Sequence, residues 1–270
     1  MGSRRVMSRF MGGALALCAM AARGDDSVAF IPYLEAGISD YSLTYDGVAP
    51  LPGFPYIAFG ETKLNFDFTH YKLGLAGSWR DFYVNAYFRG TSEASDTMVF
   101  TDYIDVAPDA PPINWNGDRQ AYSVSVGYNI NASLAVFGGY RDSETSGDGS
   151  GNSKYSFQHD GFTVGASYRW GLTDTGGLSV SLGYALLDFS LAYKLVDNNL
   201  IPKVEEDGSG YKFSVVWRDY FNDRTGYTVG FEYFDYDYEV PGAEIGLGKV
   251  GDTDVEERES SFSIGLFHVL

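Results

Sequence analysis

Apolar and polar residues alternate along most of the chain, with the two-residue period of a β-strand that meets different surroundings on its two faces. In the cleanest case, Tyr122, Val124, Val126 and Tyr128 alternate with Ser123, Ser125 and Gly127. The same period predicts ten strands, at residues 28–45, 61–78, 81–92, 118–129, 133–143, 153–170, 178–195, 209–221, 225–240 and 257–270. Several apolar rows end on tyrosine or tryptophan, as in the aromatic girdles of membrane barrels.

The expected connections alternate between two lengths. Short ones lie at 78–81, 129–132, 171–177 and 222–225, and long, polar ones lie at 46–60, 93–117, 144–152, 196–208 and 241–256. Short turns at one end and long loops at the other are typical of a transmembrane up-and-down β-barrel. The sequence therefore predicts an all-β fold, an antiparallel barrel of about ten strands. Eight or twelve strands stay open, because segment 178–197 is long enough to rise above a membrane as barrel wall.

Two segments break the alternation. On one, the apolar row Leu64, Phe66 and Phe68 is followed by Tyr71, Leu73 and Leu75, and on the other Leu182 and Tyr184 are followed by Leu187, Phe189 and Leu191. A β-bulge would shift the row in this way, and so would a strand that leaves the bilayer.

The last ten residues form an alternating strand without a charged side chain. Its outward row is expected to hold Phe262, Ile264, Leu266, His268 and Leu270, and its inward row Ser261, Ser263 and Gly265. The stretch resembles the carboxy-terminal insertion signal of Gram-negative outer-membrane β-barrel proteins, in which a polar residue, a glycine and outward bulky residues follow one another to the chain end. The family favours aromatics where this chain has His268 and Leu270. The resemblance implies insertion by the barrel-assembly machinery and contact with outer-membrane lipid and lipopolysaccharide.

The amino-terminal end has the pattern of a secretory signal peptide. Arg4, Arg5 and Arg9 precede a short apolar segment at 11–22, and Ala19-Met20-Ala21 fits a cleavage site. We expect residues 1 to about 21 to be removed and residues 22–270 to form a single barrel domain. A buried amino-terminal helix, and acylation of Cys18 as in a lipoprotein, are the alternatives. Cys18 is the single cysteine, so cleavage would leave no thiol chemistry.

Composition narrows the class further. The chain has 21 tyrosines and 19 phenylalanines and a mean hydropathy of −0.16, with no apolar run of about 18 residues, which excludes a helical membrane bundle. The formal net charge is −17, or about −20 after loss of the signal arginines, so nucleic acid is excluded as a partner. A secreted, acidic and soluble β-sandwich remains the structural alternative.

Eight charged residues are expected to face the barrel lumen, because they lie on strands whose opposite row is apolar: Glu35, Asp67, Lys72, Arg89, Arg169, Lys212, Arg218 and Glu232. They either pair with one another across a narrow interior or line a small water-filled pore. Paired packing is favoured for an interior of about ten strands, which long side chains fill easily.

Enzymatic and cofactor chemistry find little support in the sequence. His70, His159 and His268 are the only histidines, and His159 and its neighbour Asp160 point to opposite faces of one strand. The omptin-like proteases are comparable in strand number only, so no enzymatic activity is expected. The acidic stretches 205–207 and 252–257 lack EF-hand spacing, and weak divalent-ion bridging to lipopolysaccharide is their most plausible binding role. The glycines at 147–151 form no phosphate loop, and no cofactor is expected.

Two functions stay open after this reading. The protein is either a porin-like passive channel with a charged lumen, passing a small solute, or a surface-interaction barrel whose long loops at 93–117 and 241–256 bind a ligand outside the cell. The sequence leaves the oligomeric state undetermined.

Overall fold

The computed structural model describes residues 28–50, 57–100, 113–149, 153–194, 204–240, 244–245, 248–249 and 253–270. The expected signal peptide at 1–21, with Cys18, lies outside the described residues. Within the described ranges, no helix is long and apolar enough to cross a membrane.

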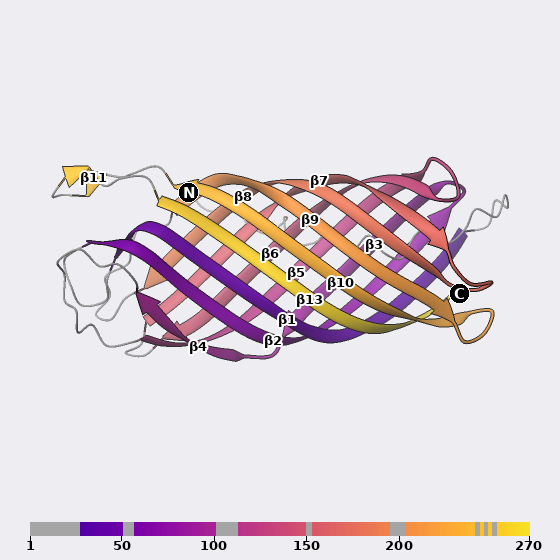
Figure 1. Ribbon diagram of the computed structural model, residues 1–270, viewed down its shortest axis with the longest axis horizontal. Coiled ribbons are helices and arrows are strands. Elements are labelled where there is room, and N and C mark those ends of the chain that lie inside the picture. The colour runs from indigo at the N-terminus through magenta and orange to yellow at the C-terminus, as the bar shows by residue number, and fades with distance from the viewer. Residues whose placement is uncertain are drawn as a thin grey trace, which may run out of the picture.

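The described chain forms a closed antiparallel β-barrel (Figure 1). Its wall strands are β1 (Val28–Pro50), β2 (Ile57–Trp79), β3 (Phe82–Thr91), β4 (Ala94–Phe100), β5 (Ile113–Asn129), β6 (Leu134–Gly149), β7 (Ser153–Gly171), β8 (Gly177–Lys194), β9 (Val204–Tyr220), β10 (Thr225–Val240) and β13 (Thr253–His268). Each wall position pairs with the next one along the chain, with β3 and β4 both lying between β2 and β5, and β1 closes the barrel by pairing with both β2 and β13. A separate two-stranded ribbon joins β11 (Glu244–Ile245) and β12 (Gly248–Lys249).

Strands β3 and β4 are two halves of one position in the wall, so the barrel has ten strands. Tyr71 of β2 pairs with Gly90 of β3, and eight residues earlier on β2, Lys63 pairs with Val99 of β4. The β3–β4 chain therefore contains one residue more than its partner between these pairs, which is a β-bulge. The predicted all-β up-and-down barrel of about ten strands is confirmed.

The strands extend further toward the long connections than the sequence pattern predicted. Residues 93–117, expected to be loop, contain β4 and the start of β5, and β6 continues to Gly149, whereas β7 begins at Ser153 as predicted. The expected loops 46–60, 196–208 and 241–256 are likewise shortened by β1, β2, β9 and β13. The outward residues of these strand ends are polar. A prediction that looks for an apolar outward row therefore misses the alternation there.

The outer face has two zones. Near the short turns, which we call the turn end, large apolar side chains are exposed in a continuous band, including Leu34, Ile38, Leu73, Val126, Phe162, Leu186 and Ile264. On β1 this band runs from Val28 to Ile38, close to the 9–11 residues that a tilted strand needs to cross a bilayer. Toward the opposite end, the loop end, outward positions become polar, as at Asp40, Asn65 and Asp188. Roughly half of each strand therefore stands above the apolar band.

The interior reverses this polarity at the loop end. Aromatic and aliphatic side chains fill it as the loop-end cluster: Tyr41, Leu43, Tyr45, Leu64, Phe66, Phe68, Trp115, Tyr155, Phe157, Ala185, Leu187, Phe189, Phe234, Tyr236, Tyr238 and Val255. A second group, the turn-end cluster, consists of Ile31, Tyr33, Ala76, Tyr83, Tyr87, Ala135, Phe137 and Phe267. Both clusters lie inside the barrel.

This reversal explains the two breaks in alternation. The register between β1 and β2, and that between β7 and β8, runs without interruption, so neither break is a bulge. On β2, Leu64, Phe66 and Phe68 are buried inside, whereas Leu73 and Leu75 face outward. The apolar row thus changes from the interior to the outer face where the wall enters the apolar band. The bulge account is therefore wrong, and the end of the outward apolar row along each strand explains both breaks.

Candidate functional site

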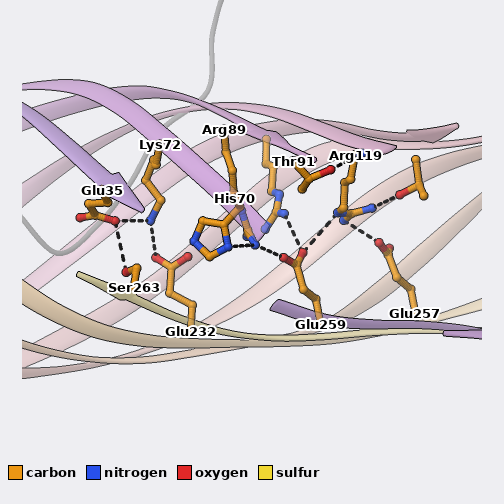
Figure 2. Close-up of polar contacts among 12 residues, drawn as sticks. Glu35, His70, Lys72, Arg89, Thr91, Arg119, Glu232, Glu257, Glu259 and Ser263 are labelled. Atoms are coloured by element: carbon orange, nitrogen blue, oxygen red, sulfur yellow. Dashed lines mark hydrogen bonds and ion pairs between the residues drawn. The ribbon is translucent and has the colours of Figure 1, made fainter. Parts of the chain in front are cut away.

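Between the two clusters, the interior holds a ladder of buried charges (Figure 2). Its first group is built around Lys72 on β2. The Lys72 Nζ atom lies 2.9 Å from Glu35 Oε2 on β1 and 3.4 Å from Glu232 Oε1 on β10. Lys212 on β9 also approaches Glu232, at 4.0 Å, and Ser263 donates a 3.5 Å hydrogen bond to Glu35. This group joins strands that are far apart in sequence.

The second group is built around two glutamates of β13. Glu259 lies 2.5 Å from Arg89, 3.3 Å from Arg119 and 3.4 Å from Arg141, so three guanidinium groups share one carboxylate. Glu257 lies 2.7 Å from Arg119. Because an unpaired charge inside a barrel would be costly, this sharing is the arrangement expected of a packed interior.

Glu257 also faces a histidine and a tyrosine. The Nδ1 atom of His159 lies 2.8 Å from Glu257 Oε2, and the Tyr238 hydroxyl donates a 2.9 Å hydrogen bond to the same oxygen. Both rings come from the loop-end side, so Glu257 connects the charges to the loop-end cluster.

Aromatic rings provide further contacts for the cations. Arg141 lies 4.0 Å and Lys212 4.8 Å from the centroid of Phe234, and Arg119 lies 4.5 Å from that of Tyr41. Arg218 similarly covers the ring of Phe267 in the turn-end cluster, at 5.1 Å. Such contacts stabilise cations that have left water.

Most of the expected lumen charges lie inside the barrel. Six of them have side chains buried in the interior: Glu35, Lys72, Arg89, Lys212, Arg218 and Glu232. Arg169 shares the inward row of β7 but lies near the turn that leads to Gly177, where it is partly exposed.

Asp67 is a correction, because the structure places it on the outer face. The prediction took Phe66 and Phe68 as the outward row of β2 and therefore assigned Asp67 to the lumen. Those two rings belong to the loop-end cluster instead, so the intervening aspartate points to solvent.

Four charged residues of the ladder were missed in the sequence: Arg119, Arg141, Glu257 and Glu259. The signal for the glutamates was present, because the inward row of Ser263 and Ser261 continues by steps of two to Glu259 and Glu257. Arg119 was likewise in step with Ser123 and Ser125, but it stood next to a segment interpreted as loop.

The histidines have the placement that strand geometry predicted. His159 points inward and its neighbour Asp160 outward, so the two form no pair. His70 lies inside, 3.2 Å from Arg89 through its Nδ1 atom. His268 lies on the outer face, where its Nδ1 atom lies 2.9 Å from the Thr225 hydroxyl.

The carboxyl-terminal strand also has the expected orientation. Phe262, Ile264, Leu266, His268 and Leu270 face outward, and Gly265 faces inward. The Leu270 backbone N–H donates a 2.9 Å hydrogen bond to the Phe30 carbonyl, which anchors the chain end to β1.

Acidic residues form a row on the outer face just above the apolar band. Asp142, Asp160, Asp188 and Asp207 are direct partners on the successive strands β6 to β9. Burial, together with the neighbouring carboxylates of Asp160 and Asp207, raises the pKa of Asp188. No described group of three or more histidine, cysteine, aspartate or glutamate side chains is arranged to hold a metal ion.

No family model and no curated protein matches the chain. Solved structures do. The outer-membrane protease OmpT of Escherichia coli superimposes with a TM-score of 0.61 at 12% identity, covering 90% of this chain and 97% of that one. The translocator domain of the autotransporter NalP from Neisseria meningitidis gives a TM-score of 0.47 at 9% identity, covering 91% and 90%. OprG of Pseudomonas aeruginosa gives 0.40 at 13% identity, covering 92% and 98%.

These similarities concern the fold. The closed barrel, its outward apolar band and the OmpT superposition give this chain the architecture of Gram-negative outer-membrane β-barrel proteins. At 12% identity, nothing about the activity of OmpT is transferred to this chain.

Proposed function

We propose that the protein is a closed outer-membrane barrel that acts at the cell surface through its raised loop end, and that it does not conduct solutes. The observation that carries the proposal is the packing of the lumen. Buried ion pairs occupy its middle, and a hydrophobic cluster occupies each side of them. An open channel needs a continuous row of hydrated side chains, whereas Glu257 and Glu259 are each only 1% exposed.

The raised wall supports a surface role. The strands of the barrel are 16 to 23 residues long, apart from the two halves β3 and β4, although about 9–11 residues suffice to span a bilayer. Since the interior of the raised part is a packed aromatic cluster, this part forms a rigid base for the connections at the loop end. In this proposal the partner is contacted by the connections at 101–112 and 241–252, of which the structure describes only the ribbon of β11 and β12.

A catalytic role has less support. His70 and His159 are 2% and 0% exposed, so a substrate has no access to either ring in this conformation. A reaction at the loop end would have to use other groups, and the described outer acids stand in a row without a histidine.

The location and biogenesis of the protein belong to the same proposal. The exported chain loses residues 1 to about 21, is inserted into the outer membrane by the barrel-assembly machinery, and contacts lipid and lipopolysaccharide through its outer face. Amino-terminal sequencing of the protein from outer-membrane fractions tests this step. A chain that begins near Ala22 is expected, and a retained Met1 would contradict it.

Conductance measurements test the closed lumen. Purified, heat-modifiable protein is added to planar bilayers, and the same preparation is tested by liposome swelling in a small sugar. We expect no conductance steps and no swelling, either for the wild type or for Arg218→Gln. Stable open conductance, with an open porin as the positive control for both assays, would overturn the proposal.

Surface binding needs a separate test. Cells that display the protein are tested for adhesion to immobilised matrix proteins and polysaccharides, with and without replacement of residues 101–112 by a short turn. The replacement should preserve the heat-modifiable gel shift and abolish adhesion. Adhesion no greater than that of cells without the protein, on every tested surface, counts against the surface role.

A further inference from the structure

The buried charges of the interior do not balance. Six cationic side chains are buried, Lys72, Arg89, Arg119, Arg141, Lys212 and Arg218, against four carboxylates, Glu35, Glu232, Glu257 and Glu259. Arg218 has contacts of its own beside Phe267 in the turn-end cluster and is left out of the balance. With His70 and His159 counted as neutral, the other buried groups are five cations and four carboxylates, which leaves one excess positive charge. Uncompensated charge in a low-dielectric interior is costly, so a counterion would be stabilising there.

The excess is most marked at Arg141 and Lys212. Each shares its carboxylate with another cation that lies closer to it. Lys212 is 4.0 Å from Glu232, which Lys72 approaches to 3.4 Å, and Arg141 is 3.4 Å from Glu259, which Arg89 approaches to 2.5 Å. Both cations also contact the ring of Phe234, and both line the same small cavity.

Arg141 has donors left over. Its Nη2 atom faces Glu259, but its Nε and Nη1 atoms are buried and have no hydrogen-bond partner among the described residues. A buried donor without a partner costs free energy, and a guanidinium makes this cost larger.

A small cavity adjoins these two cations. Its volume is about 20 Å³, and its lining includes Arg141, Lys212, Ser125, Thr163, Phe234 and Tyr236. About 10–15 Å³ suffices for one water-sized occupant, so a monatomic ion fits and a phosphate or a carboxylate does not. The lining joins two cations with hydroxyl donors, the combination that suits a small anion.

We propose that this cavity binds one monovalent halide, chloride under physiological conditions, as a structural counterion between Arg141 and Lys212. The anion accepts hydrogen bonds from the unused Arg141 donors and from the hydroxyls, and it screens the two cations from each other. The site is independent of the proposed surface role, because it concerns the interior of the closed barrel alone.

Crystallography with bromide tests the site directly. The full-length mature protein is unfolded in urea, refolded into detergent in sodium bromide and crystallised, and anomalous scattering is recorded at the bromine edge. One internal peak beside Arg141 and Lys212 is expected. Density for water alone, without anomalous signal, would overturn the proposal.

Stability measurements give an independent readout. Urea unfolding is followed in sodium chloride and in sodium gluconate at equal ionic strength, because gluconate is too large for the cavity. At chloride ten times above its dissociation constant, the unfolding equilibrium constant should fall roughly tenfold relative to gluconate. Equal midpoints in the two salts count against the site.

Matched variants locate the effect. Thr163→Val keeps the size of the side chain and both cations but removes a hydroxyl from the cavity, and it should weaken the dependence on chloride. Thr228→Val makes the same change at a buried interior position that does not line the cavity and should leave that dependence intact. Arg141→Gln should abolish the chloride dependence where it folds, and equal dependence in Thr163→Val and Thr228→Val would contradict the assignment.

Discussion

The His159 Nδ1 atom lies 2.8 Å from Glu257 Oε2, and the two side chains are 0% and 1% exposed. The residues are 98 positions apart, on β7 and β13, which are not neighbours in the sheet. Their contact therefore crosses the barrel interior. It shows that the barrel is narrow enough for side chains from distant strands to meet in its interior.

Removal of the Glu257 charge should destabilise the barrel strongly. In Glu257→Gln, the negative charge beside Arg119 and His159 is lost, and one of the two acceptor oxygens that face them becomes an amide NH2, inside a region without solvent. Breaking a buried pair from one side costs about 3–5 kcal/mol. The free energy of unfolding in detergent, followed by tryptophan fluorescence in urea, measures this loss.

The adjacent residue provides the control. Glu256 lies on the outer face of the same strand and pairs with the half-exposed Arg258. Exposed pairs contribute at most about 1 kcal/mol, so Glu256→Gln should change stability little. Equal effects of the two substitutions would mean that water reaches Glu257.

The loop-end cluster should contribute to stability as a protein core does. Phe157 is fully buried and its ring contacts those of Phe189 and Tyr238, at centroid distances of 5.8 and 5.7 Å. Phe157→Ala should cost about 3–5 kcal/mol in urea unfolding, whereas Phe157→Leu, which fills more of the space, should cost less than half as much. Neither variant should conduct ions, because the ladder of buried charges between the two clusters remains in place. Conductance in Phe157→Ala would show that this cluster alone closes the lumen.

The boundary of the apolar band can be located with lysine substitutions on one strand. Ile264 lies within the band, and Ser260 points outward above it. A lysine facing the middle of the bilayer costs about 2–4 kcal/mol and one near the interface about 0–1 kcal/mol. Ile264→Lys should therefore lower the unfolding free energy in lipid vesicles far more than Ser260→Lys. Similar costs at both positions would place the bilayer elsewhere along the wall.

The fold was largely predictable, because alternation reports which residues share a face. The orientation of the last strand, with Phe262 and Leu266 outward and Gly265 inward, followed from the pattern alone. The alternation does not report which medium a face meets. On β2, Phe66 and Phe68 were taken to face outward, although they face a packed interior, and Asp67 was misplaced with them.

The partners of the charged residues were not predictable from the sequence. Lys72 and Glu232 meet because of the barrel's register and tilt, which no local pattern encodes. Glu259 was missed for a related reason, since its role depends on three arginines from three other strands. Charges in step with an inward row of small residues are the local signal that could have identified it.

The row of outer aspartates predicts a dependence of stability on pH. Asp188 faces Asp160 and Asp207 on the adjacent strands and stands above the apolar band, where solvent reaches it. Partial desolvation of the carboxylate first, and then these neighbouring carboxylates, raise its pKa in the folded state, so the folded protein binds this proton more readily than the unfolded chain does. The contribution of Asp188 to stability should therefore be unfavourable at neutral pH. It should become more favourable as the pH falls through the raised pKa of the folded state, and level off below the pKa of the unfolded chain.

Comparison of wild type with Asp188→Asn isolates this contribution from the other titrating groups. Because like charges directly opposite each other on adjacent strands repel, the variant should unfold at a higher urea concentration at pH 7.5, and the difference should shrink toward pH 4. Asp174→Asn, in the exposed turn between β7 and β8, is the control and should show no such trend. A variant less stable than wild type at pH 7.5 would indicate that the ionised carboxylate of Asp188 is stabilising, as it would be if a bound cation offset the repulsion in this row.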